Sequence, residues 1–121
     1  MSIQHYRELI VWQKAMRLAK LCYHVTKVFP KAELFGMTSQ IRRAAASIPA
    51  NIAEGHGRAH TREYLNHLSI ARGSLAELET HLILSQDVGL LEEVALRDCL
   101  ALADDISRML SALRRSLENH L

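Results

Sequence analysis

A chain of 121 residues with 49% hydrophobic and 5% aromatic residues suits one compact domain, so we expect a single domain over residues 1–121. Only five glycines and two prolines among abundant Ala, Leu and Glu argue against a β fold with many turns and favour an all-α fold. The charge is uneven, because residues 1–62 carry a net +7 and residues 63–121 a net −5. The basic half could meet phosphate or an acidic partner, or it could face the acidic half of the same or a neighbouring subunit.

The amino-terminal segment MSIQHYRELIVWQ has a run of only three apolar residues between charged ones. Such a run is too short for a signal-peptide core or a membrane span. We therefore expect a cytoplasmic protein with no membrane partner. Cys22 and Cys99 lack CxxC spacing, and in a cytosolic chain they are expected to be buried small apolar groups and not a disulfide.

The first predicted helix covers residues 6–28, where apolar residues recur at spacings of three and four. They form two adjacent rows, so the helix should pack against more than one neighbour. Pro30 ends the helix, because the residue before a proline avoids the α region. The two rows are Leu9, Trp12, Met16, Ala19 and Tyr23, and Val11, Ala15, Leu18, Cys22 and Val25.

Three further helices follow. The second begins near residue 32 or 38 and fades at Gly55 and Gly57, and the third begins at residues 60–61, where His60 and Glu63 resemble a capping pair. Gly89 marks the next turn, and the fourth helix carries a heptad-like seam. Four helices of about 20 to 27 residues with short connections predict an antiparallel up-down-up-down four-helix bundle. The seam of the fourth helix is Ala95, Cys99, Leu102, Ile106, Met109, Leu113 and Leu117.

Residues 44–53, AAASIPANIA, carry no charge on any face of the second helix. An ordinary surface helix shows Lys or Glu about once a turn on its outer side, so water should be excluded here all round by a second subunit. Pro49 deletes a helical hydrogen bond and bends the helix, at a cost of order 3 kcal/mol. The candidate oligomer interface is Ala46, Pro49, Ala50 and Ala53, and Gly73 with Ser74 offers a matching thin spot on the third helix.

A polar stripe within about 80° of arc lies beside the apolar row of the second helix, which is Met37, Ile41, Ala44, Ala45, Ile48 and Ile52. The members of the stripe are Gln40, Arg43, Ser47, Asn51, Glu54 and Arg58. As structure, Glu54 and Arg58 form an i, i+4 pair that Asn51 can join in a semi-buried network. As chemistry, the same three residues could hold a phosphate or a water. One carboxylate without a second acid, a nucleophile or a metal set is a poor catalytic group, so the structural interpretation is favoured.

The sequence predicts no catalytic residue, no metal ligand and no cofactor. His56 and His60 straddle Gly57, so they do not present two imidazoles on one helical face. Ser47 and Ser74 lack a neighbouring histidine or the strand-turn-helix context of a nucleophile elbow. The segment GHGR lacks the lysine and the spacing of a P-loop. We expect a protein that is not an enzyme.

Four segments together resemble one family. They are YRELIVWQKAMRLA (6–19), FP (29–30), TSQIRRAAASIPANIAEGHGR (38–58) and ARGSLAELETHL (71–82), of which the SIPANIAEG block is the most specific. The family comprises four-helix-bundle proteins encoded in intervening sequences of bacterial 23S rRNA genes, formerly labelled S23 ribosomal proteins. The resemblance covers most of the chain, although from about residue 90 only the apolar rhythm matches. It implies an antiparallel four-helix bundle that assembles as a ring-shaped homopentamer, with no catalytic residues to carry over.

A related branch comprises the accessory proteins of diversity-generating retroelements, pentamers that bind nucleic acid and the reverse transcriptase. The leading functional hypothesis is a non-enzymatic ring that presents a basic surface to RNA or DNA backbone. The alternative is a scaffold that docks another protein, such as a polymerase, with no direct role for nucleic acid. Candidate carriers of nucleic-acid binding are Arg7, Lys14, Arg17, Lys20, Lys27, Lys31, Arg42, Arg43, Arg58 and Arg62.

Overall fold

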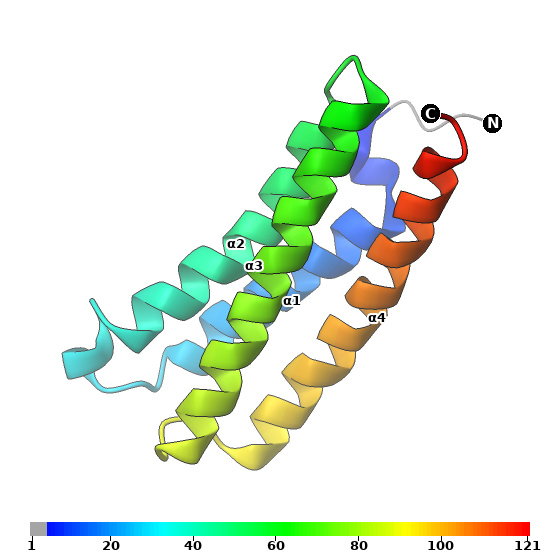
Figure 1. The fold of residues 1–121 in the computed structure, drawn as a ribbon. Coiled ribbons are helices and arrows are strands. Elements are labelled where there is room, and N and C mark those ends of the chain that lie inside the picture. Colours follow the sequence, from blue (N-terminus) through cyan, green and yellow to red (C-terminus); the bar gives the residue numbers. More distant parts are fainter. Residues whose placement is uncertain (1–4) are drawn as a thin grey trace.

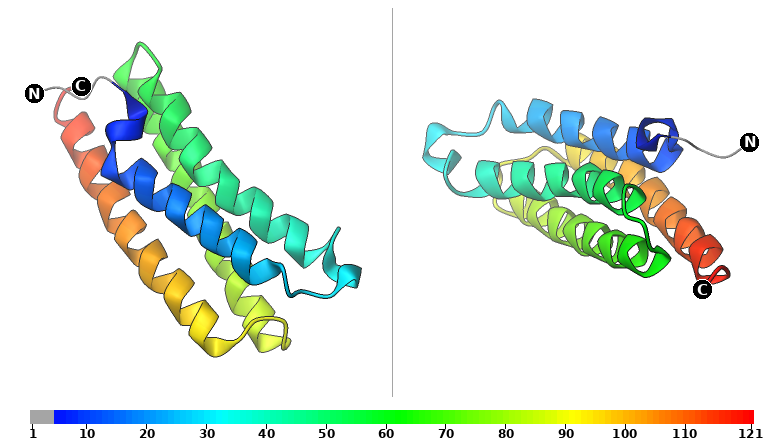
Figure 2. Two further views of the ribbon diagram at one scale, coloured as in Figure 1. Left: turned by 180° about the vertical axis from the view of Figure 1, so that it is seen from behind. Right: turned by 90° about the horizontal axis from the view of Figure 1, so that it is seen from above.

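The computed structural model describes residues 5–121, which form four long helices and no strand (Figure 1). The helices are α1 (Ile10–Thr26), α2 (Met37–His56), α3 (Thr61–Asp87) and α4 (Glu93–Glu118). Each helix packs against the helices before and after it, and α1 also packs against α4, which closes the bundle. Successive helices run in opposite directions, as the further views show (Figure 2). The predicted all-α, antiparallel up-down-up-down four-helix bundle is confirmed.

At the amino-terminal end of the bundle, the helix that the sequence predicts from residue 6 is interrupted. A short 3-10 helix, η1 (Tyr6–Glu8), is capped by Nδ1 of His5, which accepts a hydrogen bond from the amide of Arg7 at 3.2 Å. Leu9 is extended and buried, so α1 begins only at Ile10. The break folds the Tyr6 ring back against Trp12, with ring centroids 5.2 Å apart. The predicted start was wrong because this aromatic contact and the burial of Leu9 outweigh the continuity of the helix.

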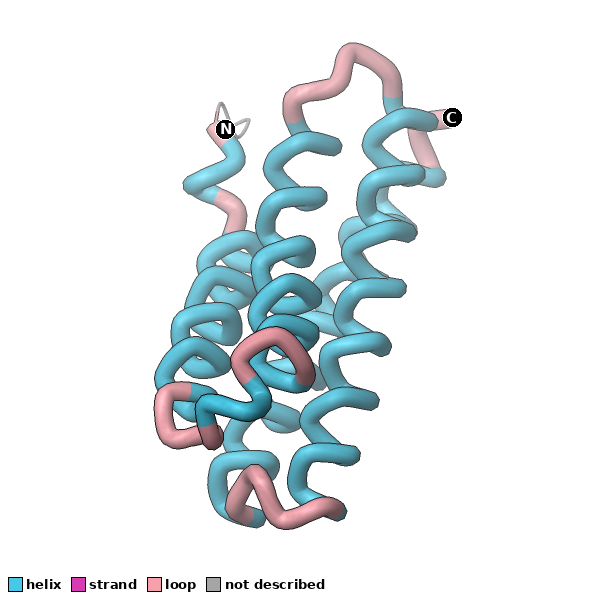
Figure 3. The backbone as a smooth tube through the Cα atoms, turned by 90° about the vertical axis from the view of Figure 1, so that its left-hand side faces the viewer, coloured by secondary structure: helices cyan, strands magenta, loops and turns pink. Residues whose placement is uncertain are grey.

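The carboxyl end of α1 lies two residues before the predicted one. The buried hydroxyl of Thr26 donates a hydrogen bond to the Cys22 carbonyl at 2.7 Å and accepts one from Nε of Arg42 at 2.9 Å. Phe29 is buried, and Pro30 leads into the short 3-10 helix η2 (Lys31–Glu33). The chain therefore crosses from α1 to α2 with one apolar side chain held in the core (the loop is seen in Figure 3).

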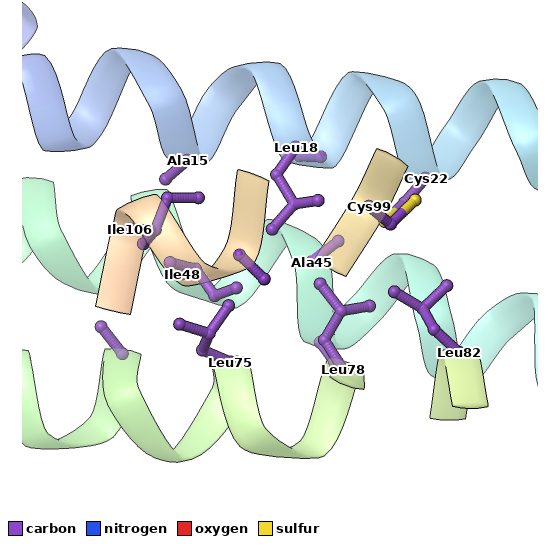
Figure 4. Close-up of a cluster of buried hydrophobic side chains, with 14 of the residues drawn as sticks. Ala15, Leu18, Cys22, Ala45, Ile48, Leu75, Leu78, Leu82, Cys99 and Ile106 are labelled. Carbon is purple, nitrogen blue, oxygen red and sulfur yellow. The ribbon is translucent and has the colours of Figure 1, made fainter. Parts of the chain in front are cut away.

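The core is built from one row of each helix (Figure 4). In α1 the second predicted row is the deeper one, although Ala19 of the first row is also buried and Val25 of the second is half-buried, and in α4 Ala103 and Leu110 lie deeper than Leu102 and Met109 of the predicted seam. Cys22 and Cys99 face each other across α1 and α4 as buried free thiols, as predicted. The contact with Cys99 and burial both raise the pKa of Cys22, so this thiol stays protonated. The shared core residues are Val11, Ala15, Leu18, Ile41, Ala45, Ile48, Ile52, Leu68, Leu75, Leu78, Leu82, Ala103, Ile106 and Leu110.

The glycines of the second helix serve two purposes. At Gly55 the backbones of α2 and α3 approach so closely that an added Cβ would lie 2.8 Å from Cβ of His67 and 2.9 Å from Cδ1 of Tyr64. Gly57 caps the carboxyl end of α2, where the sequence predicts that the helix fades. Gly89, with φ +84°, makes the turn between α3 and α4 that the sequence predicts. No helix within residues 5–121 combines the length and the apolar character needed to cross a bilayer.

Candidate functional site

An apolar groove of about 560 Å³ runs between α1 and α2, and the AAASIPANIA segment forms one of its walls. Ala46 and Ala50 are exposed on this wall, Ala53 is half-buried and Pro49 is buried in the subunit. Four members of the first apolar row of α1 form the other wall: Trp12 and Met16, which are half-buried, Ala19, which also reaches the core, and Tyr23, which is exposed. A single subunit therefore does not exclude water from this segment. The groove is lined by Tyr6, Trp12, Met16, Ala19, Lys20, Tyr23, His24, Lys27, Ala46, Pro49, Ala50 and Ala53.

One end of the groove is held by Arg42. Its guanidinium lies over the Tyr23 ring, 4.7 Å from the centroid, and its Nε donates to the hydroxyl of Thr26. Arg42 thereby holds Tyr23 in place although this residue is 46% exposed. Among the predicted carriers of nucleic-acid binding, Arg42 thus has a structural role that joins α1 to α2.

The polar stripe of α2 divides into two parts, and the first part lies between α2 and α3. The amide of Asn51 donates to the carbonyl and the hydroxyl of Ser47 at 2.9 and 3.1 Å. Its oxygen lies 3.1 Å from Nδ1 of His67, and the hydroxyls of Ser47 and Ser74 are 2.8 Å apart. These half-buried side chains form a continuous network, because each has a partner on the facing helix or on its own.

The second part of the stripe is exposed. Glu54 accepts a hydrogen bond from Arg58 at 3.1 Å, and a second carboxylate, Glu63, lies 3.7 Å from the same guanidinium. Asn51 does not bond Glu54 directly; His67 lies between them, with its Nδ1 3.6 Å from the Glu54 carboxylate. The predicted capping pair is wrong, because His60 makes no side-chain cap bond and Glu63 turns toward Arg58. Gln40 and Arg43, at the other end of the stripe, are exposed.

His67 is a member of this network that the sequence analysis missed, and Ser74 was assigned only to close packing. The two residues are seven apart in α3, which is two helical turns, so they share one face. Ser47 and Asn51 are four apart on α2 and face them. The signal for this network in the sequence was that polar residues recur at matching spacings on the second and third helices. Within residues 5–121, no three His, Cys, Asp or Glu side chains gather as metal ligands.

The ten predicted cationic residues differ in what surrounds them. Lys14 pairs with Asp105 of α4 at 3.2 Å, and Arg58 pairs with two carboxylates. The bond from Lys14 is the main cause that lowers the pKa of Asp105, with Arg108 adding to it. Arg7 donates to the ring of His5. Among residues 5–121, the exposed cations with no acidic partner are Arg7, Arg17, Lys20, Lys27, Lys31, Arg43 and Arg62 from that set.

Large apolar side chains gather at the end of the bundle that holds the α1–α2 and α3–α4 connections (lower end in Figure 1). Phe35 is 93% exposed and Val28 83% exposed, both beside the α1–α2 connection. Val88 and Val94 are exposed on either side of the α3–α4 turn. We call this surface the apolar end; it consists of Val28, Leu34, Phe35, Val88 and Val94.

Comparison with known proteins gives the fold and the family. One solved structure, described as a protein with unknown function from the S23 ribosomal protein family of Bacteroides thetaiotaomicron, aligns with a TM-score of 0.78. The alignment covers 87% of this chain and 98% of the other at 23% identity, so the likeness concerns the fold. A search of the curated proteins found no match. The family model described as 23S rRNA-intervening sequence protein matches residues 7–112, and the chain therefore belongs to this family, as its SIPANIAEG block indicates.

Proposed function

We propose that this protein is a non-enzymatic homo-oligomer, a ring-shaped pentamer, that binds RNA or DNA backbone through a basic surface. The apolar groove between α1 and α2 supports self-association, since aromatic and alanine side chains there leave an apolar surface that the subunit does not fully cover. The subunit number rests on the resemblance of the sequence to a family of pentamers.

The observation that carries the nucleic-acid part is the set of cations without acidic partners. Arg17 is exposed on α1, Lys31 on the connection to α2 and Arg43 on α2, and none of the three lines the groove proposed for self-association. A phosphate that meets such a cation releases condensed counterions, so each contact adds affinity that salt weakens. Repetition around a ring multiplies modest contacts into useful avidity.

The test measures retention of the purified protein on fragmented RNA and on DNA at about 50 and 200 mM salt. The variant Arg17→Glu with Lys31→Glu should lose retention at low salt. Its matched control is Arg97→Glu with Arg115→Glu, which makes the same charge change at exposed positions of α4. Light scattering on every sample checks that assembly is unchanged. Equal retention by the wild type and the first variant, or equal loss in both variants, would contradict the proposal.

The apolar end favours a second candidate, a scaffold that docks another protein. Its exposed valines and Phe35 lie outside both the core and the groove, so neither folding nor assembly through the groove covers them. For this candidate, a protein captured from a cell lysate at 200 mM salt should be lost with Phe35→Asp and kept with Arg17→Glu. Capture that depends on Arg17 and disappears with salt would favour the nucleic-acid function instead.

A further inference from the structure

Gly73 and Ser74, adjacent in α3, face different surroundings. Ser74 turns inward and meets Ser47 of α2, whereas Gly73 lies on the exposed outer face of α3. A Cβ at Gly73 would find no atom within 4 Å, and its φ is not in the left-handed region. Glycine weakens the interior of a helix relative to alanine, yet nothing inside this subunit requires it there.

The outer face of α3 around Gly73 is also unusually poor in charge. Between residues 66 and 86, the exposed charged side chains are Arg72 and Glu77 alone. Ile70 and Leu84 are 44% and 46% exposed and lie within about 60° of Gly73 around the helix. A surface helix normally shows charged residues on this side, so this face has the composition of a partly buried one.

We propose that the outer face of α3, centred on Gly73, seats in the α1–α2 groove of a second copy of this chain. This inference rests on the proposed self-association and says which surfaces meet. The missing side chain at Gly73 allows the backbone of α3 to approach the alanines Ala46 and Ala50 closely. Apolar side chains on either side of Gly73 then cover the aromatic wall of the groove.

Charge complementarity selects a second copy as the occupant. Lys20 and Lys27 line the groove, and Glu77 lies one turn after Gly73 on the face that would enter it, whereas Arg72 lies about 100° away around the helix. The same complementarity holds for the whole chain, with a net +7 in residues 1–62 and a net −5 in residues 63–121. Contact between the basic α1–α2 surface of one copy and the acidic α3–α4 surface of another is electrostatically favourable. Contact between two basic or two acidic surfaces is unfavourable.

The two surfaces are different parts of one subunit, because α2 separates α3 from α1 (Figure 2). The contact is therefore head-to-tail, and each subunit offers a free groove to one neighbour and a free α3 face to another. Such heterologous contacts produce closed rings or open filaments, whereas a contact of like faces would stop at a dimer.

The test is cysteine cross-linking between two single variants, Ala50→Cys and Gly73→Cys. Both positions are exposed in the subunit, and the native thiols are buried. The two variants are made with tags of different mass, mixed, and oxidised with diamide. We expect disulfides that join unlike variants, and a ladder of covalent multimers from the double variant. The matched control replaces Gly73→Cys by Ser116→Cys on the exposed face of α4, which should give no cross-link.

The outcomes separate this inference from the self-association on which it rests. A wild-type protein that is monomeric by light scattering at all concentrations overturns both. An assembled protein whose disulfides join Ala50→Cys to itself, form equally with Ser116→Cys, or do not form overturns only the pairing of surfaces. Gly73→Ala provides a second measurement: it should weaken assembly at least about tenfold while the helical content of the dilute subunit stays unchanged.

Discussion

At Gly55 two helix backbones approach so closely that a single methyl group has no room. Gly55→Ala should gain about 1 kcal/mol of helix propensity and lose about 1–3 kcal/mol by crowding Tyr64 and His67, for a net loss of stability. Urea unfolding followed by circular dichroism measures the difference. The control is Gly57→Ala two residues later, where the nearest atom to the new Cβ is 3.6 Å away, and there the change should stay within about 0.5 kcal/mol. Equal stability of the two variants would show that α2 and α3 can separate without cost.

In the polar stripe, the residue that matters most for stability should be Asn51. Asn51→Ala removes three hydrogen bonds between half-buried groups and leaves His67 without its amide partner, so it should cost about 1–3 kcal/mol. Glu54→Gln should cost no more than about 0.5 kcal/mol, because the Glu54 side chain is 53% exposed and its ion pair with Arg58 is screened. If Glu54→Gln lowers the free energy of unfolding in urea more than Asn51→Ala does, Glu54 and not Asn51 is the central residue of the network.

Between α1 and α4, the Lys14–Asp105 pair gives the bundle a pH-dependent contact. Hydrogen bonding from Lys14 lowers the pKa of Asp105 below its usual value, so the folded state binds this proton less readily than the unfolded chain. The contribution is therefore present above the unfolded pKa near 4 and is lost as pH falls through the lower folded pKa. Asp105→Asn should be less stable than the wild type at pH 7, and the difference should shrink at pH 3. A difference that is independent of pH would contradict this assignment.

Helix number, direction and most core residues follow from the sequence, because the spacing of apolar residues alone determines which side of each helix is buried. The ends of α1 do not follow, since they depend on contacts with other helices: Tyr6 with Trp12, and Thr26 with Arg42. Only the α2 wall of the groove was predictable from the sequence. The uncharged segment of α2 indicated an interface, but the aromatic residues of α1 were assigned only to packing between helices, and the structure shows that they also line the groove.

The network of the stripe was only partly predictable for a similar reason. A helical wheel places Asn51, Glu54 and Arg58 together, but it does not show which of them the neighbouring helix covers. Gly55 brings α3 close to α2 at this level, so Asn51 turns to His67 and leaves Glu54 in water. A hydrogen-bond partner on another helix can be predicted only when the packing of the two helices is known. The sequence of one helix does not contain that information.

For the whole molecule, an exposed alanine on the groove separates assembly from folding. Ala50→Glu keeps α2 intact, because Ala50 is exposed in the subunit and Glu is a good helix former. In an assembly that covers the groove, the same carboxylate would be buried without a matched partner, at a cost of several kcal/mol. Association should therefore weaken at least about 100-fold.

The expected result is an Ala50→Glu protein with the mass of one chain in light scattering and the helical circular dichroism of the wild type. Ala101→Glu, an exposed alanine on α4, is the matched control and should keep the wild-type mass. Because binding of one copy to another stabilises the folded state, the wild-type Tm should rise with protein concentration and that of Ala50→Glu should not. An Ala50→Glu variant that assembles like the wild type would show that the groove faces solvent in the assembly, and that the aromatic wall has another partner.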